Sequence, residues 1–272
     1  TMTMTDKNGY YNWDPYGTIQ ANAYGIIAAS ESERRRDVFS GHIDLKFNII
    51  KGLTFTSSNG VDYYNNTSYS FTPQSVNGAG KNSMGNSNLQ RMLLQSSNNI
   101  TYNHTWNDKH YLTVTGVWEA TKSTIRNMGI SGSSLQAESV GWWDVKNAVT
   151  RDATNGYSDW ALLSGVGRVI YNYDNRYMLT GTFRADGSSR FTNDKWGYFP
   201  SVAVAWTASN ESFMESTRDL ISNLKIRASY GVIGNQDIDP YSTLAILNTT
   251  TTYFGNSSGV TGYWANTLAT PD

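Results

Sequence analysis

The chain has 272 residues and a formal net charge of -1, with 13% aromatic and 16% charged residues. Soluble domains carry about 25% charged residues, so uncharged polar side chains supply most of the polar surface here. The balanced charge disfavours nucleic acid as a partner, and the absence of cysteine excludes disulfides, thiolate metal sites and cysteine nucleophiles.

The sequence indicates neither a membrane helix nor a leader peptide. No apolar run approaches the roughly 20 residues that a membrane-spanning helix needs. The first residues, Thr1–Met4, have neither the basic region nor the apolar region of a secretory signal. The chain is therefore either soluble or crosses a membrane as β-strands.

Apolar and polar side chains alternate along much of the chain, as they do on strands with two unlike faces. Between residues 42 and 49, every odd position from Ile43 to Ile49 is apolar. Most of the predicted strands reach the 9–11 residues that a tilted strand needs to cross a bilayer. The alternation predicts eight strands, at 37–49, 53–67, 89–106, 111–125, 161–173, 177–186, 199–209 and 222–232.

The connections between these strands are alternately short and long. Outer-membrane barrels have this arrangement, with short periplasmic turns and long extracellular loops. A further connection, 210–221, opens with Asn210 as a cap followed by acidic residues, which predicts a short helix on the short-turn side. The short connections are 50–52, 107–110 and 174–176, and the long polar ones are 68–88, 126–160 and 187–198.

Aromatic side chains cluster beside the short connections. Trp106 and Tyr111 flank one of these turns, and Tyr171, Tyr173 and Tyr177 surround another. Amphipathic rings favour the headgroup level of a bilayer. Their repetition at successive turns therefore predicts an interfacial girdle, although aromatic residues also favour strands in general.

No stretch of the sequence carries a complete catalytic, cofactor or metal motif. Gly165–Gly167 lacks the third glycine and the helix of a dinucleotide loop, and Asp6–Gly9 lacks the spacing of a calcium loop. His104 and His110 have no third ligand at metal spacing, so they are interpreted as rim residues. Acidic neighbours neutralise Arg34–Arg36, which is interpreted as part of a solvated loop. The sequence thus predicts a protein that is not an enzyme and needs no cofactor.

Several stretches in the second half of the chain resemble signature sequences of the SusC/RagA family of TonB-linked outer-membrane transporters. They occur in the order and at the spacing of that family, whereas residues 37–183 agree with it mainly in their alternation. The stretches are 184–191 (RADGSSRF), 195–201 (KWGYFPS) with Trp206, 224–236 (LKIRASYGVIGNQ), Pro240–Tyr241 and 268–272 (LATPD).

The resemblance implies an all-β fold, an antiparallel transmembrane β-barrel segment of about eight strands that make an incomplete barrel. A plugged transporter has about 22 strands, so we expect 1–272 to be part of one barrel domain, with the plug domain and barrel ends absent. The implied protein lies in the outer membrane of a Gram-negative bacterium of the Bacteroidota. It imports oligosaccharides or peptides beneath a SusD-like surface lipoprotein, driven by TonB–ExbB–ExbD through an N-terminal part outside the chain.

The predicted long loops carry the candidate ligand contacts, which could stack on sugar faces or pack on a peptide. Packing of the loops on one another or on the lipoprotein lid is the favoured alternative role. The candidates are Trp142, Trp143, Tyr157, Trp160 and Trp196.

Two other functions remain open at this point. One is a soluble extracellular all-β carbohydrate-binding module or adhesin, which would seal Ile43, Leu45, Leu179 and Ile226 between two sheets. The other is a receptor for a metal chelate, with the same barrel architecture and a different ligand.

Overall fold

The computed structural model describes residues 23–77, 80–217, 219–253 and 259–267. These residues belong to two compact units. The first unit takes its residues from Thr1–Ser40, Asp62–Met92 and Thr124–Ser158, and the second from Gly41–Val61, Leu93–Ser123 and Asp159–Asp272. The first five strands contribute to both units, and the remaining strands lie in the second.

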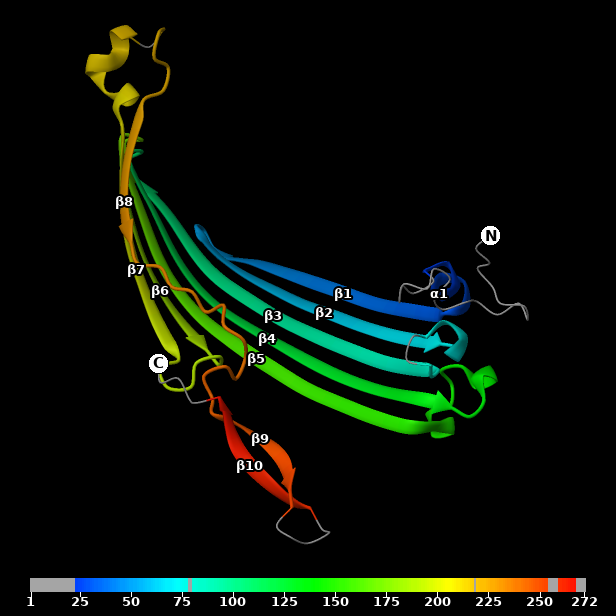
Figure 1. The fold of residues 1–272 in the computed structure, drawn as a ribbon. Helices are drawn as coiled ribbons and strands as arrows, with labels where there is room; N and C mark the ends of the chain where they lie inside the picture. Colours follow the sequence, from blue (N-terminus) through cyan, green and yellow to red (C-terminus); the bar gives the residue numbers. More distant parts are fainter. Residues whose placement is uncertain (1–22, 78–79, 218, 254–258, 268–272) are drawn as a thin grey trace. The chain divides into compact units, whose positions relative to one another are not determined.

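The strands form an eight-stranded sheet in which every strand lies beside its neighbours in the chain, in the order β1 to β8 (Figure 1). A separate two-stranded sheet pairs β9 (Ile246–Thr252) with β10 (Val260–Thr267). The main strands are β1 (Glu31–Ile50), β2 (Leu53–Thr72), β3 (Ser83–Trp106), β4 (His110–Leu135), β5 (Ala148–Tyr173), β6 (Tyr177–Ser188), β7 (Trp196–Thr207) and β8 (Lys225–Gly231). The all-β antiparallel fold class predicted from the sequence is thereby confirmed.

The helical elements are short. In the described part of the chain they are α1 (Ala23–Ala29) and five 3-10 turns, Gln74–Val76, Glu138–Val140, Val145–Asn147, Ala208–Asn210 and Ser212–Thr217. The last two replace the single helix expected over 210–221. Among the described residues, no helix has the length and apolar character needed to span a membrane.

Several predicted boundaries were wrong because strands continue into segments expected to be loops. The connections observed there are only 73–82, 136–147 and 189–195. Alternation of apolar and polar residues reveals a strand only while its two faces differ, and Ser, Thr and Asn dominate both faces of these extensions. Arg34–Arg36 also lies inside β1 and not in a solvated loop.

Two of the short turns owe their shape to Asn and Asp in left-handed conformations. Asn107 and Asp108 have φ of 51° and 52°, and Asp174 and Asn175 have φ of 53° and 56°. Backbone hydrogen bonds close both turns, from Lys109 N to Trp106 O and from Arg176 N to Tyr173 O. Asn and Asp tolerate this conformation better than most residues do, and it matches the twist of tight hairpins.

The paired residues of β5 to β8 give the second unit two unlike faces. Cross-strand partners share a face, and the register joins Leu179 to Tyr171 and Val204, and Val204 to Ala228. We call their side the apolar face. It consists of 163, 165, 167, 169, 171 and 173 on β5, 177, 179, 181, 183, 185 and 187 on β6, 196, 198, 200, 202, 204 and 206 on β7, and 226, 228 and 230 on β8.

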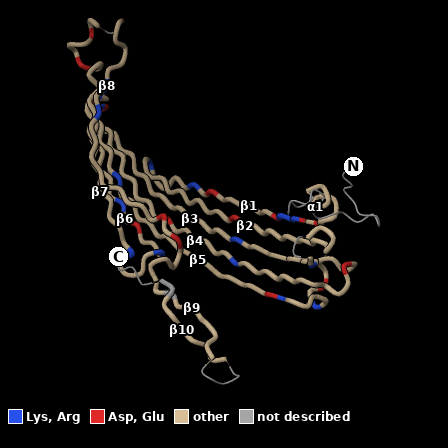
Figure 2. Tube along the Cα trace, in the orientation of Figure 1, with Lys and Arg blue, Asp and Glu red and all other residues tan. Residues whose placement is uncertain are grey.

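The apolar face of these paired residues contains no charged side chain. The opposite side, which we call the polar face, carries all the charged residues of the paired region, which are Arg168, Arg184, Asp186, Lys225 and Arg227. Figure 2 shows how sparse charged residues are along the strands.

Side chains on the apolar face are not covered by a second layer of the described chain. Leu179 is 49% exposed and Ile226 is 54% exposed, and on β1 the corresponding values for Ile43 and Leu45 are 63% and 48%. The two-sheet alternative predicted that these four residues would be sealed, and the described residues do not seal them. An apolar surface of this extent indicates contact with lipid or with another protein.

Candidate functional site

The polar face of the second unit is crossed by a charged network centred on Arg184. Its Nε lies 2.8 and 2.7 Å from the two carboxylate oxygens of Asp186, and its Nη2 donates to Ser164 Oγ at 3.1 Å. Nη2 also lies 3.7 Å from Glu119 Oε2, whose other oxygen accepts a hydrogen bond from Ser97 at 3.1 Å. The network spans β3 to β6 and pairs one guanidinium with two carboxylates.

At the long-loop end of this unit, Arg190 forms hydrogen bonds with the segment that follows β8. Its guanidinium stacks 4.7 Å from the ring centre of Trp160 and donates to the carbonyl of Ile238 at 2.7 Å and to that of Gln236 at 3.4 Å. The Arg190 side chain is only 14% exposed. Two of the family-like stretches, 184–191 and 224–236, therefore meet in space, which their separation in the sequence did not reveal.

A cavity of about 210 Å³ lies beside this junction. Asp186, Phe191, Asp194, Phe199 and Gln236 are among the residues that line it. Its lining combines two carboxylates, one ammonium, two amides and three rings, which is the type of lining that can hold a small polar solute.

The structure does not gather the five predicted ligand contacts into one site. Trp142 and Trp143 lie between β4 and β5, where their rings pack 6.0 and 5.7 Å from the ring of Tyr69. Trp142 also packs on the small core of Phe71, Met84, Leu135 and Ala148. Trp142 thus has a structural role in the first unit, while Trp143 is 75% exposed.

The other three candidates are in strands and not in loops as expected. Tyr157 and Trp160 lie inside β5, where Arg126 lies 6.0 Å from the ring centre of Tyr157. Trp196 begins β7 on the apolar face and pairs with Gly187, so its ring lies against that glycine. Trp160 has the strand parity of the polar face, and it is covered by Arg190.

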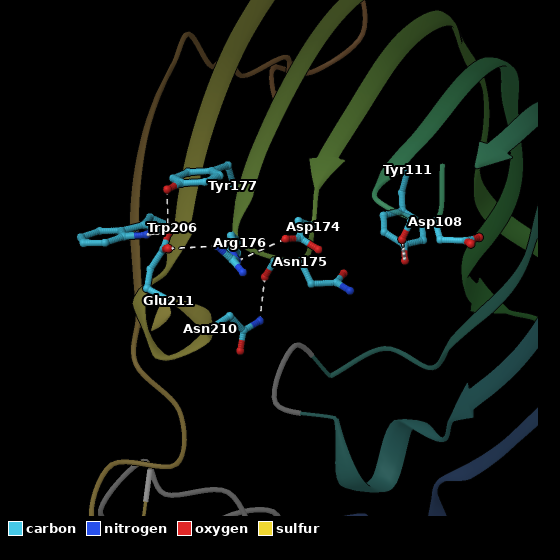
Figure 3. A network of polar contacts seen from close by, with 9 residues as sticks. All are labelled: Asp108, Tyr111, Asp174, Asn175, Arg176, Tyr177, Trp206, Asn210 and Glu211. Atoms are coloured by element: carbon cyan, nitrogen blue, oxygen red, sulfur yellow. Dashed lines mark hydrogen bonds and ion pairs between the residues drawn. The ribbon is translucent and has the colours of Figure 1, made fainter. Parts of the chain in front are cut away.

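The short-turn edge carries a polar network that the sequence did not indicate (Figure 3). Glu211, in the connection between β7 and β8, accepts hydrogen bonds from Tyr177 Oη at 2.6 Å, Trp206 Nε1 at 3.0 Å and Arg176 Nη1 at 3.2 Å. Asn210 Nδ2 donates to the carbonyl of Asn175 at 2.9 Å. The connection is thereby fixed to the turn between β5 and β6.

The electrostatic environment of Glu211 favours its charged form. Its side chain is 12% exposed. The hydrogen bond from Tyr177, followed by that from Trp206 and by the charge of Arg176, lowers the pKa of the Glu211 carboxyl below its usual value. The carboxylate is therefore ionised at neutral pH and serves as the acceptor at the centre of the network.

Aromatic rings form a continuous band beside the same turns. Tyr102, His104, Trp106 and His110 stack in succession, with ring centres 5.9, 5.6 and 5.0 Å apart. His110 Nδ1 lies 2.7 Å from the hydroxyl of Tyr171. Both histidines are thus engaged with rings at the turn edge, and no group of three metal-ligating side chains occurs among the described residues.

A meander of long antiparallel strands with one uncharged apolar face, one polar face and an aromatic band at its tight turns defines a segment of a transmembrane β-barrel wall. No family model matches the chain. Individual proteins and solved structures do match it, and they agree with this class.

Three curated proteins of Formosa agariphila, all named TonB-dependent receptors, match most of the chain. TonB-dependent receptor P3 is 32% identical over 247 residues, and P39 is 30% identical over 258 residues. These matches cover 87% and 91% of the chain and 24% of each relative. SusC of Bacteroides thetaiotaomicron is 42% identical over 91 residues, which are 32% of the chain and 9% of SusC.

Solved structures of the RagAB peptide transporter share the fold. One matches with a TM-score of 0.84 at 20% identity and covers 97% of this chain and 30% of that one. The open-open state of the RagAB peptide importer matches with a TM-score of 0.83 at 21% identity. The chain belongs to the TonB-dependent receptors. Its partial match to SusC and the fold that it shares with RagAB confirm the resemblance stated from its sequence. It spans about a quarter of the length of the curated receptors that it matches over most of its own length.

Proposed function

We propose that residues 1–272 are part of the barrel wall of an outer-membrane receptor that imports nutrients with energy relayed by TonB. The observation that carries the proposal is the uncharged apolar face of β5 to β8, which is about half exposed at Leu179, Val204 and Ile226. Hydrocarbon suits such a face, and the polar face then meets the lumen. The whole chain is one piece of a single barrel domain, with the plug domain outside it.

The imported ligand in this proposal is an oligosaccharide or a peptide. RagAB is described as a peptide transporter, and the family resemblance extends to oligosaccharides. The polar face offers the paired ions of Arg184, Asp186 and Glu119 and the further cations of Arg168, Lys225 and Arg227, and these groups can bind the polar groups of either ligand. Candidate contacts are the residues near the 210 Å³ cavity and Trp160, together with the exposed Trp143.

The partners in this proposal are a SusD-like surface lipoprotein at the long-loop edge and the TonB–ExbB–ExbD system, engaged through the N-terminal part of the receptor. Its location is the outer membrane of a Gram-negative bacterium of the Bacteroidota. Relatives from Formosa and Bacteroides support that assignment. The relatives are named as receptors and the matched structures as transporters, which supports a protein without enzymatic activity.

An uptake experiment tests the proposal. The gene that encodes the receptor with these residues is deleted from its host, and uptake of labelled oligosaccharide mixtures, oligopeptide mixtures and a ferric chelate is measured. We expect one of the first two to fall to background, with recovery on complementation and loss in a strain without TonB. Loss of the chelate alone would support the metal-chelate alternative, and unchanged uptake of all three would reject the proposal.

A further inference from the structure

A groove of about 630 Å³ crosses the apolar face of the second unit from β2 to β7. Its size falls within the range of about 300–1,000 Å³ typical of ligand pockets. Small side chains, at Ser96, Ala120, Ala161 and Gly187, form a depression between larger neighbours. Leu94, Leu163 and Trp196 line its sides.

Ring contacts show that the groove opens on the apolar face and not toward the polar side. Trp106 of β3 stacks on Tyr171, which belongs to the apolar face of β5, and on His110 of β4. Because side chains alternate along a strand, Ala120 and Lys122 share the side of His110. Ala161 has the same parity on β5 as Leu163, and Gly187 pairs directly with Leu163.

One cation lies in this otherwise apolar groove. Lys122 lines it and is exposed. In the part of the chain that the structure describes, no carboxylate lies within ion-pair distance of Lys122. Lys195, also exposed, adds a second ammonium to the lining.

The level of Lys122 along the strand corresponds to the far boundary of the hydrocarbon layer. The stretch from His110 to Lys122 slightly exceeds the 9–11 residues that a tilted strand needs to cross a bilayer. A cation at that boundary reaches the headgroup layer. Ser96, Ala120 and Leu163 lie nearer the short turns than Lys122 does, so this part of the groove lies at the level of the acyl chains.

We propose that this groove binds a lipid with an anionic phosphate headgroup, whose acyl chain lies on the small residues and whose phosphate pairs with Lys122. The apolar lining matches an acyl chain, and the unpaired ammonium groups match a negative headgroup. Basic pockets on membrane proteins recognise anionic lipids in this manner. The assignment rests on the proposed placement of the apolar face against lipid, and it names one site on that face.

The test uses the receptor that carries residues 1–272, purified in a neutral detergent and examined by native mass spectrometry. Phosphatidylglycerol, phosphatidylcholine and inorganic phosphate are titrated separately. We expect phosphatidylglycerol to bind in preference to the other two. Lys122→Gln should weaken its binding about fivefold, because a cation near a lipid surface contributes about 1 kcal/mol, and Lys122→Arg should restore it.

Filling the groove provides the second measurement. Ala120→Trp, or Ala161→Trp if the first variant does not assemble, should reduce phosphatidylglycerol binding at least tenfold. The matched controls are Val169→Trp on the apolar face outside the groove and Lys46→Gln on β1, and both should bind as the parent does.

Three outcomes overturn the assignment. Equal binding of phosphatidylcholine with no effect of Lys122→Gln would show acyl-chain binding without headgroup recognition. Inorganic phosphate binding that depends on Lys122 but not on Ala120 would show a free phosphate site, and a protein displaced by Ala120→Trp would show a protein interface. None of these results would contradict the barrel placement, which the strand variants discussed below test separately.

Discussion

At the scale of single residues, Glu211 has the most defined role in the structure. Its carboxylate accepts three hydrogen bonds from Arg176, Tyr177 and Trp206, and so joins the connection after β7 to the turn before β6. The sequence placed Glu211 only in the first turn of an expected helix. Its partners come from two places in the chain, the adjacent Arg176 and Tyr177 and the end of β7 at Trp206, so the acidic pattern after Asn210 could not have identified them.

The lowered pKa of Glu211 predicts that the network weakens in acid. A carboxyl whose folded pKa lies below its unfolded value, about 4.3 for Glu, contributes its full stabilisation above the unfolded value. That contribution declines as the pH falls below 4.3 and is lost once the pH passes below the folded pKa. The hydrogen-exchange protection factors of residues 208–217, which correct for the intrinsic pH dependence of amide exchange, should therefore fall in this acidic window.

Two variants make the acid experiment specific. Glu211→Gln keeps an oxygen acceptor but loses the charge, so its exchange should be faster at neutral pH and should lack the acid transition. Glu215→Gln changes an exposed acid in the same connection and should retain the behaviour of the parent. An acid transition that persists in Glu211→Gln would assign the effect to another group.

At the scale of strands, the alternation of apolar and polar residues predicted the parts of the strands that have one apolar face. It did not predict the polar extensions of these strands. Ile43, Phe183 and Ile226 alternate with polar residues, and the strands predicted around them were found. The start of β5 was missed because residues 148–160 are polar on both sides of the strand. The β9–β10 hairpin, rich in Thr, was missed for the same reason.

The two faces of β6 should respond differently to a buried charge. Leu179→Arg places a guanidinium on the apolar face and should lower the free energy of unfolding in a lipid bilayer by about 2–4 kcal/mol if the site is near the midplane. Thr180→Arg, the adjacent residue on the polar face, should have a much smaller effect. Urea titration of the reconstituted receptor measures both, and equal losses would contradict a lipid-facing Leu179.

At the scale of the whole molecule, the family-like sequences predicted the fold class but not the site. Stretches such as 184–191 and 224–236 identified the barrel, and their contact through Arg190 explains why both have a defined form. The aromatic candidates lie on different elements and on both faces of the sheet, and their role as ligand contacts stays a prediction. Trp160 and Trp196 illustrate this, since the first lies under Arg190 and the second lies on the apolar face.

The predicted orientation of the strands can be measured with single cysteines, because residues 1–272 contain none and any cysteine elsewhere in the receptor can be replaced first. Lys146 and Lys109 are both exposed, the first in the connection between β4 and β5 and the second in the turn between β3 and β4. In the receptor, Lys146→Cys should react with a membrane-impermeant maleimide on intact cells. Lys109→Cys should react only after the outer membrane is opened, and the reverse pattern would invert the proposed topology.

The order of the sheet has a final consequence for how this wall can be made. β1 and β8 each pair with one neighbour in the eight-stranded sheet, so one row of amides and carbonyls on each is left without a partner there. Hydrocarbon offers no substitute for these bonds, and each unmet group costs several kcal/mol. The edge strands β1 and β8 must therefore pair with other strands before or during insertion into the membrane. In water, unpaired edge strands would pair with those of other copies of the chain.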